Sequence, residues 1–127
     1  MKDIDPVMKQ TFLKDYNDYL VVIKALEMEQ LDTDIGIEQL QTLIEDIIDD
    51  MFIMDQEAHD LFIEQRNRIS LENKKAKEDR LLRIKEPNDT LDDRNIKRLL
   101  NKQYDLPKHR QFLKIIKEIA YRQGWFR

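Results

Sequence analysis

Nucleophilic catalysis would need an activated side chain, and this sequence offers few candidates. It contains no cysteine, and Ser70 is its single serine. Ser70 lies in a highly charged segment where no histidine or lysine has the spacing of an activating base. With two glycines in 127 residues, a glycine-rich phosphate loop is not expected. We therefore expect no catalytic residues, no cofactor and no small-molecule substrate, so the protein is predicted not to be an enzyme.

Histidines are the other candidates for chemistry. His59 follows Asp55 by four residues, which could place two metal ligands on one helical face. No Glu-x-x-His pair accompanies them, so no metal site is predicted. His109 stands between Lys108 and Arg110. We expect a solvated side chain there, with lowered basicity or a phosphate contact as the alternatives.

Charge is divided unevenly along the chain. Residues 1–60 carry four basic against sixteen acidic side chains, a net charge of −12. Residues 61–90 have a net charge of +2, and residues 91–127 have +6. Such asymmetry favours an anionic partner at one end and a cationic partner at the other. The alternative is that the two regions neutralise one another, within one molecule or between copies.

The acidic part has the pattern of two helices. Apolar residues spaced by three and four fall on one helical face from residue 12 to 26, in a helix that we expect over 6–30. After a turn predicted at 31–36, the same spacing resumes from Ile37 and continues to Leu61. An antiparallel hairpin is the simple solution. Its outward acidic residues, predicted to bind a protein partner, include Asp46, Asp49 and Asp50.

The second helix of this hairpin has no glycine or proline between residues 37 and 86. It could therefore run unbroken, coiled-coil-like, into a polar extension over 63–86. A bend at Asp55, acting as a new cap, is the alternative. Pro87 and the turn residues after it end the helix.

The last third has the pattern of a short, basic pair of helices. Thr90 and Asp93 form an imperfect capping box before a helix that reaches about residue 103. Residues 104–107 predict a joint, and a second helix follows to about residue 123. The pair resembles a helix-turn-helix in its brevity. Its predicted contacts to nucleic acid or another acidic surface are Arg94, Lys97, Arg98, Lys102, Lys108, Arg110, Lys114 and Lys117.

Two further interpretations concern this region. The basic side chains of the C-terminal helices can equally form a solvated face or bind to the acidic hairpin. Trp125 and Phe126 are predicted either to fold back on the last helix as a lid, which we favour, or to form an exposed hook for a partner protein. The sequence does not decide between a monomer and self-association.

Together these features predict an all-α protein with three parts: an acidic hairpin (1–62), a polar extension (63–86) and a basic unit (87–127). We expect a cytoplasmic adaptor, because no apolar leader or membrane-length run is present. Its basic unit would contact nucleic acid or another acidic surface. The alternative is a protein-binding regulator or assembly factor acting through the acidic hairpin. In size and composition the chain is similar to small accessory proteins of phages and mobile elements.

Overall fold

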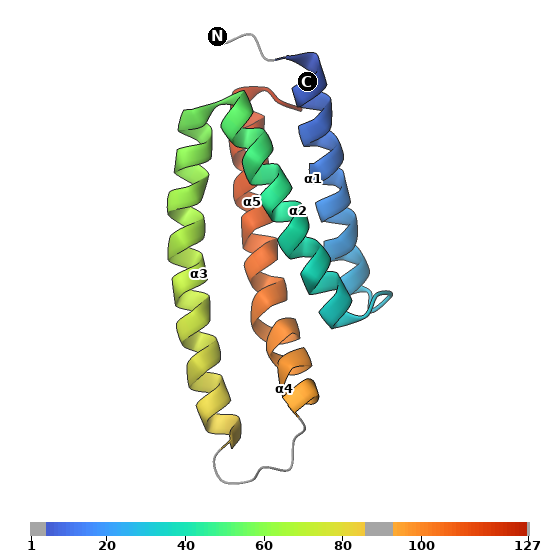
Figure 1. Cartoon of the computed structure of the whole chain (residues 1–127), viewed down its shortest axis with the longest axis vertical. Helices are drawn as coiled ribbons and strands as arrows, with labels where there is room; N and C mark the ends of the chain where they lie inside the picture. Colours follow the sequence, from blue (N-terminus) through green and yellow to red (C-terminus); the bar gives the residue numbers. More distant parts are fainter. Residues whose placement is uncertain (1–4, 86–92, 127) are drawn as a thin grey trace.

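The computed structural model describes residues 5–85 and 93–126, and these residues form an all-α structure. Its elements in chain order are α1 (Pro6–Glu27), α2 (Thr33–Met54), α3 (Gln56–Lys85), α4 (Asp93–Leu100), the π-helical segment η1 (Asn101–Asp105) and α5 (Leu106–Gln123) (Figure 1). The prediction of an all-α fold is confirmed. No helix among the described residues combines the length and the apolar character required to span a membrane.

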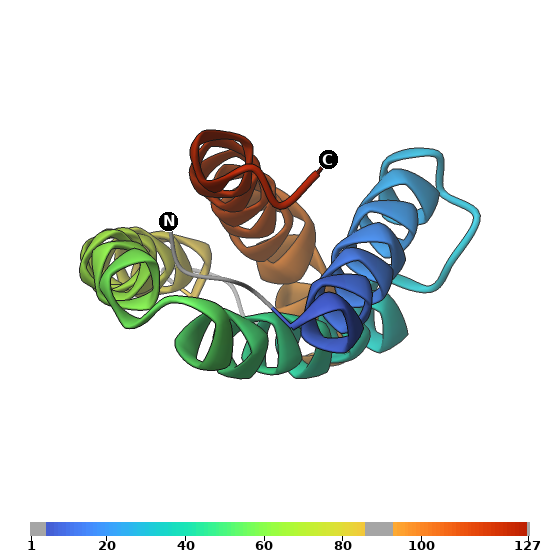
Figure 2. The same cartoon turned by 90° about the horizontal axis from the view of Figure 1, so that it is seen from above.

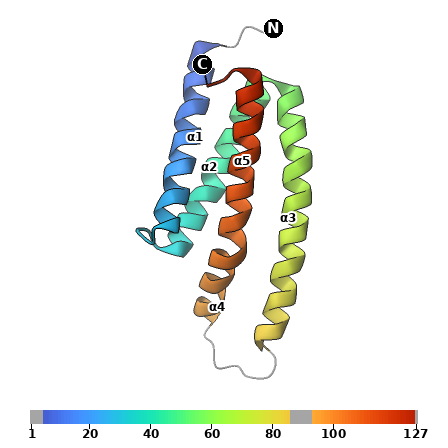
Figure 3. The ribbon, with the colours of Figure 1, turned by 180° about the vertical axis from the view of Figure 1, so that it is seen from behind.

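Helix α1 follows the sequence pattern closely. Asp5 caps it by accepting a hydrogen bond from the Val7 N–H (3.0 Å), as short acidic side chains do at helix starts. The five apolar residues predicted for its buried face are the five that are buried: Phe12, Tyr16, Tyr19, Ile23 and Leu26. Helices α1 and α2 run side by side in opposite directions (Figures 1 and 3).

Helix α2 begins earlier than the sequence predicted. The carboxylate of Asp32 accepts hydrogen bonds from the N–H groups of Asp34 and Ile35, which fixes the first turn. Gly36, predicted to lie in the reversing turn, is therefore inside the helix. Its small size has a packing reason, because a Cβ at this position would overlap the side chain of Leu26.

The extended second helix predicted over 37–86 is interrupted, and the bend at Asp55 is the arrangement observed. Asp55 has an extended backbone (φ −161°, ψ 109°), and its side chain caps α3 by accepting from the Ala58 N–H (3.1 Å). The break also shifts the buried face. Leu61, predicted to continue the apolar stripe, is exposed, whereas its neighbour Phe62 is fully buried.

Helix α3 does not project from the molecule. It turns back at Asp55 and lies alongside α5 (Figures 1 and 3). Its first two turns bury Ala58 and Phe62 in the core. The remaining polar length packs against the C-terminal helices through Ile69 and through hydrogen bonds. The predicted helix end at Pro87 and the Thr90 cap lie outside the described residues.

The predicted helix-turn-helix is wrong, because the C-terminal segment is one continuous helical run. Leu100 and Leu106, on either side of η1, both have right-handed helical backbone angles. Pro107 has no N–H to offer to the preceding turn. The wider π turn directly before it accommodates this loss without breaking the helix, and a joint at 104–107 is therefore absent.

The core is shared by helices from both ends of the chain. Viewed from above, α5 lies opposite α2, with α1 and α3 on either side (Figure 2). A single cluster of buried residues takes side chains from α1, α2, α3 and α5 and includes Trp125. Residues of the predicted 1–62 and 87–127 parts therefore pack against one another. The division into three parts stays a prediction about folding units.

Candidate functional site

Arg98, Lys102 and Arg110, which belong to the eight predicted basic contacts, form ion pairs with acidic residues of the hairpin. Arg98 lies 3.6 Å from Asp32, Lys102 lies 3.0 Å from Glu29, and Arg110 lies 3.8 Å from Glu27. The acidic partners are located at the end of α1 and in the turn before α2. These pairs correspond to the alternative in which C-terminal cations dock the acidic hairpin, and their exposed positions make each a weak contributor to stability.

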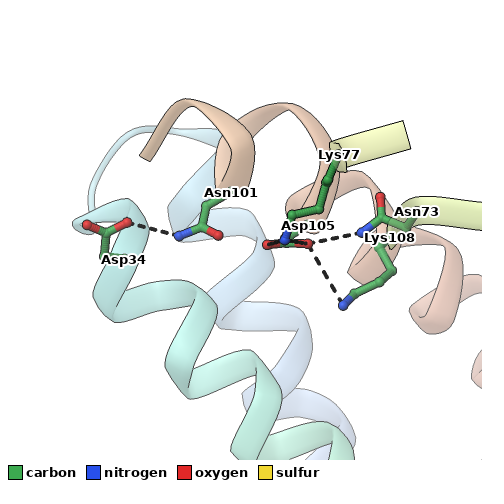
Figure 4. A network of polar contacts seen from close by, with 6 residues as sticks. All are labelled: Asp34, Asn73, Lys77, Asn101, Asp105 and Lys108. Carbon is green, nitrogen blue, oxygen red and sulfur yellow. Dashed lines mark hydrogen bonds and ion pairs between the residues drawn. The ribbon is translucent and has the colours of Figure 1, made fainter. Parts of the chain in front are cut away.

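Lys108 is positioned differently, beside a buried carboxylate. Asp105 of η1 accepts hydrogen bonds from Asn73 (3.0 Å) and from Lys77 (3.0 and 3.2 Å), and the Lys108 ammonium lies 3.9 Å away (Figure 4). Two hydrogen-bond donors from α3 and one ammonium from α5 therefore surround this one acid.

A second hydrogen bond joins η1 to α2: the side-chain amide of Asn101 donates to Asp34 Oδ1 at 3.0 Å (Figure 4). These hydrogen bonds fix the positions of α3 and α2 relative to η1. A buried carboxylate needs such partners, since an uncompensated one costs several kcal/mol.

The remaining predicted basic residues are exposed. Lys114 and Lys117 lie nearly one turn apart on α5, and Arg94 and Lys97 lie on α4. Pairs three residues apart share a helical face. Lys114 and Lys117 therefore present two cations together on the surface of α5.

The acidic residues predicted to bind a partner divide into two groups. Asp46 and Asp49 are exposed, as expected. Asp50 is not: it is 7% exposed, and its Oδ2 has no hydrogen-bond partner among the described residues. Its predicted outward position is wrong, because α1 covers this edge of α2.

The environment of Asp50 favours its neutral form. Burial is the largest cause, followed by a side-chain hydrogen bond to Asp15 of α1 and by the charges of Asp15, Asp46 and Asp49. Together they raise the pKa of Asp50 to about 8. Two carboxyl groups in contact cannot both ionise at low cost, so Asp50 keeps its proton up to near neutral pH.

The C-terminal aromatic residues form the lid rather than the hook. Trp125 is fully buried and packs edge-on against Phe12 (5.1 Å between ring centroids). Phe126 is partly buried against Phe12 and Tyr16. Gly124, in the left-handed conformation (φ 75°), reverses the chain so that Trp125 reaches the core. Their prediction as partner-binding residues is therefore wrong for Trp125.

His109 is buried, and its predicted solvation is wrong. Tyr19 Oη lies 2.6 Å from His109 Nδ1 and 3.2 Å from the His109 carbonyl oxygen. Burial, and next the charge of Lys108, lower the pKa of His109 to about 3, although Asp105 opposes the shift. The ring is therefore neutral at physiological pH. Its spacing of three residues before Phe112 extends the apolar stripe of α5, and this signal could have predicted its burial.

An extended surface hollow lies between α1 and α2. We call it the α1–α2 groove; its volume is about 650 Å³, and no residue of α3 or α5 lines it. Its apolar lining includes Val21, 63% exposed, and Ile35, 52% exposed. Its residues are Asp18, Val21, Val22, Ile35, Glu38, Gln39, Thr42 and Leu43. It is an apolar strip with two carboxylates and no lysine or arginine in its lining.

Among the residues that the structure describes, no three His, Asp or Glu side chains are arranged to hold a metal ion. No protein-family model matches the chain, and neither a curated protein nor a solved structure is significantly similar to it.

Proposed function

We propose that this protein is a non-enzymatic, cytoplasmic adaptor or regulator that binds a basic amphipathic helix of a partner protein in the α1–α2 groove. This is the role that the sequence suggested as the alternative, acting through the acidic hairpin. The observation that carries it is an apolar groove with exposed valine and isoleucine side chains and two acidic residues in its lining.

Apolar side chains in the groove supply the binding energy in this proposal. Val21 and Ile35 remain more than half exposed in the folded chain, and covering such surface is favourable by about 25 cal/mol per Å². Amphipathic helices bind grooves of this kind through apolar residues spaced by three and four. A partner with one apolar helical face therefore fits the lining.

The acidic residues in and near the groove favour a partner helix with a positive charge. Asp18 and Glu38 lie in the groove, and Asp46 and Asp49 add exposed carboxylates on the same helix as Glu38. Lys14 pairs with Asp18 at 3.3 Å, an exposed contact that a partner's cation can replace. The C-terminal cations Arg98, Lys102 and Arg110 meet acids of the hairpin at the α1–α2 turn, away from the groove lining. Basic helices are therefore attracted and acidic ones repelled.

The test uses two synthetic helices with identical apolar faces, one carrying lysines and the other glutamates on the polar face. Fluorescence anisotropy should show binding of the basic helix only, weakening as salt rises. Ile35→Ser should weaken binding by removing an apolar contact, and Glu38→Lys by reversing a charge. Each should lower the affinity at least tenfold.

The matched control is Glu64→Lys, an exposed charge reversal on α3 that should leave the affinity unchanged. Equal binding of both helices, or equal loss with the control, would contradict the proposal. Circular dichroism of each variant checks that the fold is retained.

Nucleic-acid binding by the C-terminal helices is the second candidate function. It is favoured by Lys114 and Lys117, which lie together on the exposed surface of α5. The double variant Lys114→Glu/Lys117→Glu should abolish a salt-sensitive retardation of duplex DNA or RNA. Absence of any retardation of the unaltered protein at low salt would eliminate this function.

A further inference from the structure

A separate cavity with a mixed polar and apolar lining lies between α2, α3 and α5, and it shares no residue with the α1–α2 groove. Its volume is about 220 Å³. Helix α3 contributes Arg66, Asn67 and Ser70, while Lys108 and His109 come from α5. Ser70, the single serine that the sequence drew attention to, therefore faces the same hollow as the buried histidine. Hydrogen-bond donors predominate in this lining, although Glu45 of α2 is also present.

Lys108 is a partly compensated donor in this lining, since its ammonium stands over the Phe112 ring at 5.9 Å from the ring centre. Its side chain is 18% exposed, and its ammonium lies 3.9 Å from Asp105 Oδ1, beyond hydrogen-bonding distance. Asp105 is already occupied by Asn73 and Lys77. Burial is the main cause of a lowered pKa of Lys108; the nearby charges of Lys77 and Arg66 add to it, and Asp105 opposes it.

The charged side chains of the lining are two cations, Arg66 and Lys108, and one carboxylate, Glu45, so positive charge is in excess. Arg66 reaches Glu45 at a long 3.5 Å and also donates to the Asn67 side chain at 3.2 Å. His109 is neutral, and its Nε2 has no hydrogen-bond partner in the described parts of the chain. Asp105 approaches the ammonium only to 3.9 Å and Glu45 the guanidinium only to 3.5 Å, so both cations can bind a further anion more closely.

We propose that this cavity binds the oxyanion of a small molecule, a phosphate or a carboxylate, through Lys108, with Arg66 and Ser70 as neighbouring donors. Lysine and arginine are the side chains that contact such oxyanions most strongly. At about 220 Å³ the cavity is smaller than an ordinary ligand pocket, which suits a small oxyanion and excludes a helix. This site is independent of the partner-binding groove, because the two share no residue.

Isothermal titration of the full chain with inorganic phosphate, and separately with succinate, tests the proposal. Sodium chloride at matched ionic strength is the reference, so that screening alone is subtracted. We expect saturable binding of one anion per chain, and the stronger of the two ligands identifies the oxyanion. Bound anion should also raise the pKa of His109, followed by the NMR shifts of its ring.

Lys108→Met keeps the length of the side chain and removes the charge, and it should weaken binding at least tenfold. Lys75→Met, at an exposed position on α3 outside the cavity lining, is the matched control and should bind as the unaltered protein does. Ser70→Ala tests the hydroxyl without altering any charge and should weaken binding less. Heat evolution that does not saturate, or equal affinity of Lys108→Met and the unaltered chain, would overturn the proposal.

Discussion

Replacing Asp50 by asparagine tests the electrostatics of the hairpin most directly. Asparagine has nearly the same shape and stays neutral, and its amide can donate to the Asp15 carboxylate. The exchange therefore preserves the packing between α1 and α2 and removes one titrating group. We expect Asp50→Asn to stabilise the protein at neutral pH and to have little effect in acid.

The sign follows from the direction of the shift. The folded chain holds the pKa of Asp50 near 8, above its ordinary value of 3.8. The unfolded chain therefore loses this proton first as the pH rises. The stabilising effect of the protonated group is complete below about pH 4 and is lost progressively as the pH rises towards 8.

The magnitude follows from the same shift. One pKa unit corresponds to about 1.4 kcal/mol. Between pH 4.5 and 7.5 the whole shift would change the free energy of unfolding by about 4 kcal/mol. The neighbouring charges of Asp46 and Asp49 are exposed and screened by water, so we expect about half, about 2 kcal/mol.

Urea unfolding at pH 4.5 and pH 7.5, followed by circular dichroism, measures this difference. The gain from Asp50→Asn over the unaltered protein should be about 2 kcal/mol larger at pH 7.5 than at pH 4.5. Asp49→Asn, at an exposed neighbouring position, should show a smaller dependence. A gain that is equal at both pH values, or a loss at both, would refute the raised pKa of Asp50.

Three further predictions concern the core. Gly36→Ala should lower the free energy of unfolding by about 1 to 2 kcal/mol, because overlap with Leu26 outweighs the better helix propensity of alanine. Equal losses with and without Leu26→Ala, in urea unfolding, would contradict this cause. Trp125→Ala should cost about 3 to 5 kcal/mol, because the indole is fully buried; a loss below about 1 kcal/mol would place the ring outside the core. The NMR ring signals of His109 should not titrate between pH 5 and 8 in the folded protein, whereas in urea they should titrate near 6.5.

How far the sequence predicts this fold depends on the kind of residue. The apolar stripe of α1, from Phe12 to Leu26, and that of α2, from Ile37 to Met54, are buried as their spacing indicated. Local capping also follows from the sequence, since a short acidic side chain before a helix binds the next N–H groups wherever the helix lies. Periodicity and capping are local properties, so they need no knowledge of the rest of the chain.

The candidate sites depend on contacts that periodicity does not specify. Asp50 borders the apolar stripe of α2, and whether such a residue reaches water depends on how wide an arc the neighbouring helices cover. Lys108 and Ser70 meet in one cavity only because α3 turns back at Asp55 and lies against α5.

The sequence by itself determined the helical character of the chain, the buried faces of α1 and α2 and the uneven charge, because each is set by residues a few positions apart. Only the tertiary structure decided which charges meet. Asp50 lies against Asp15, and His109 against Tyr19 across 90 positions of sequence. Packing brings such residues together because the apolar faces must be covered, and the polar residues beside those faces are buried with them.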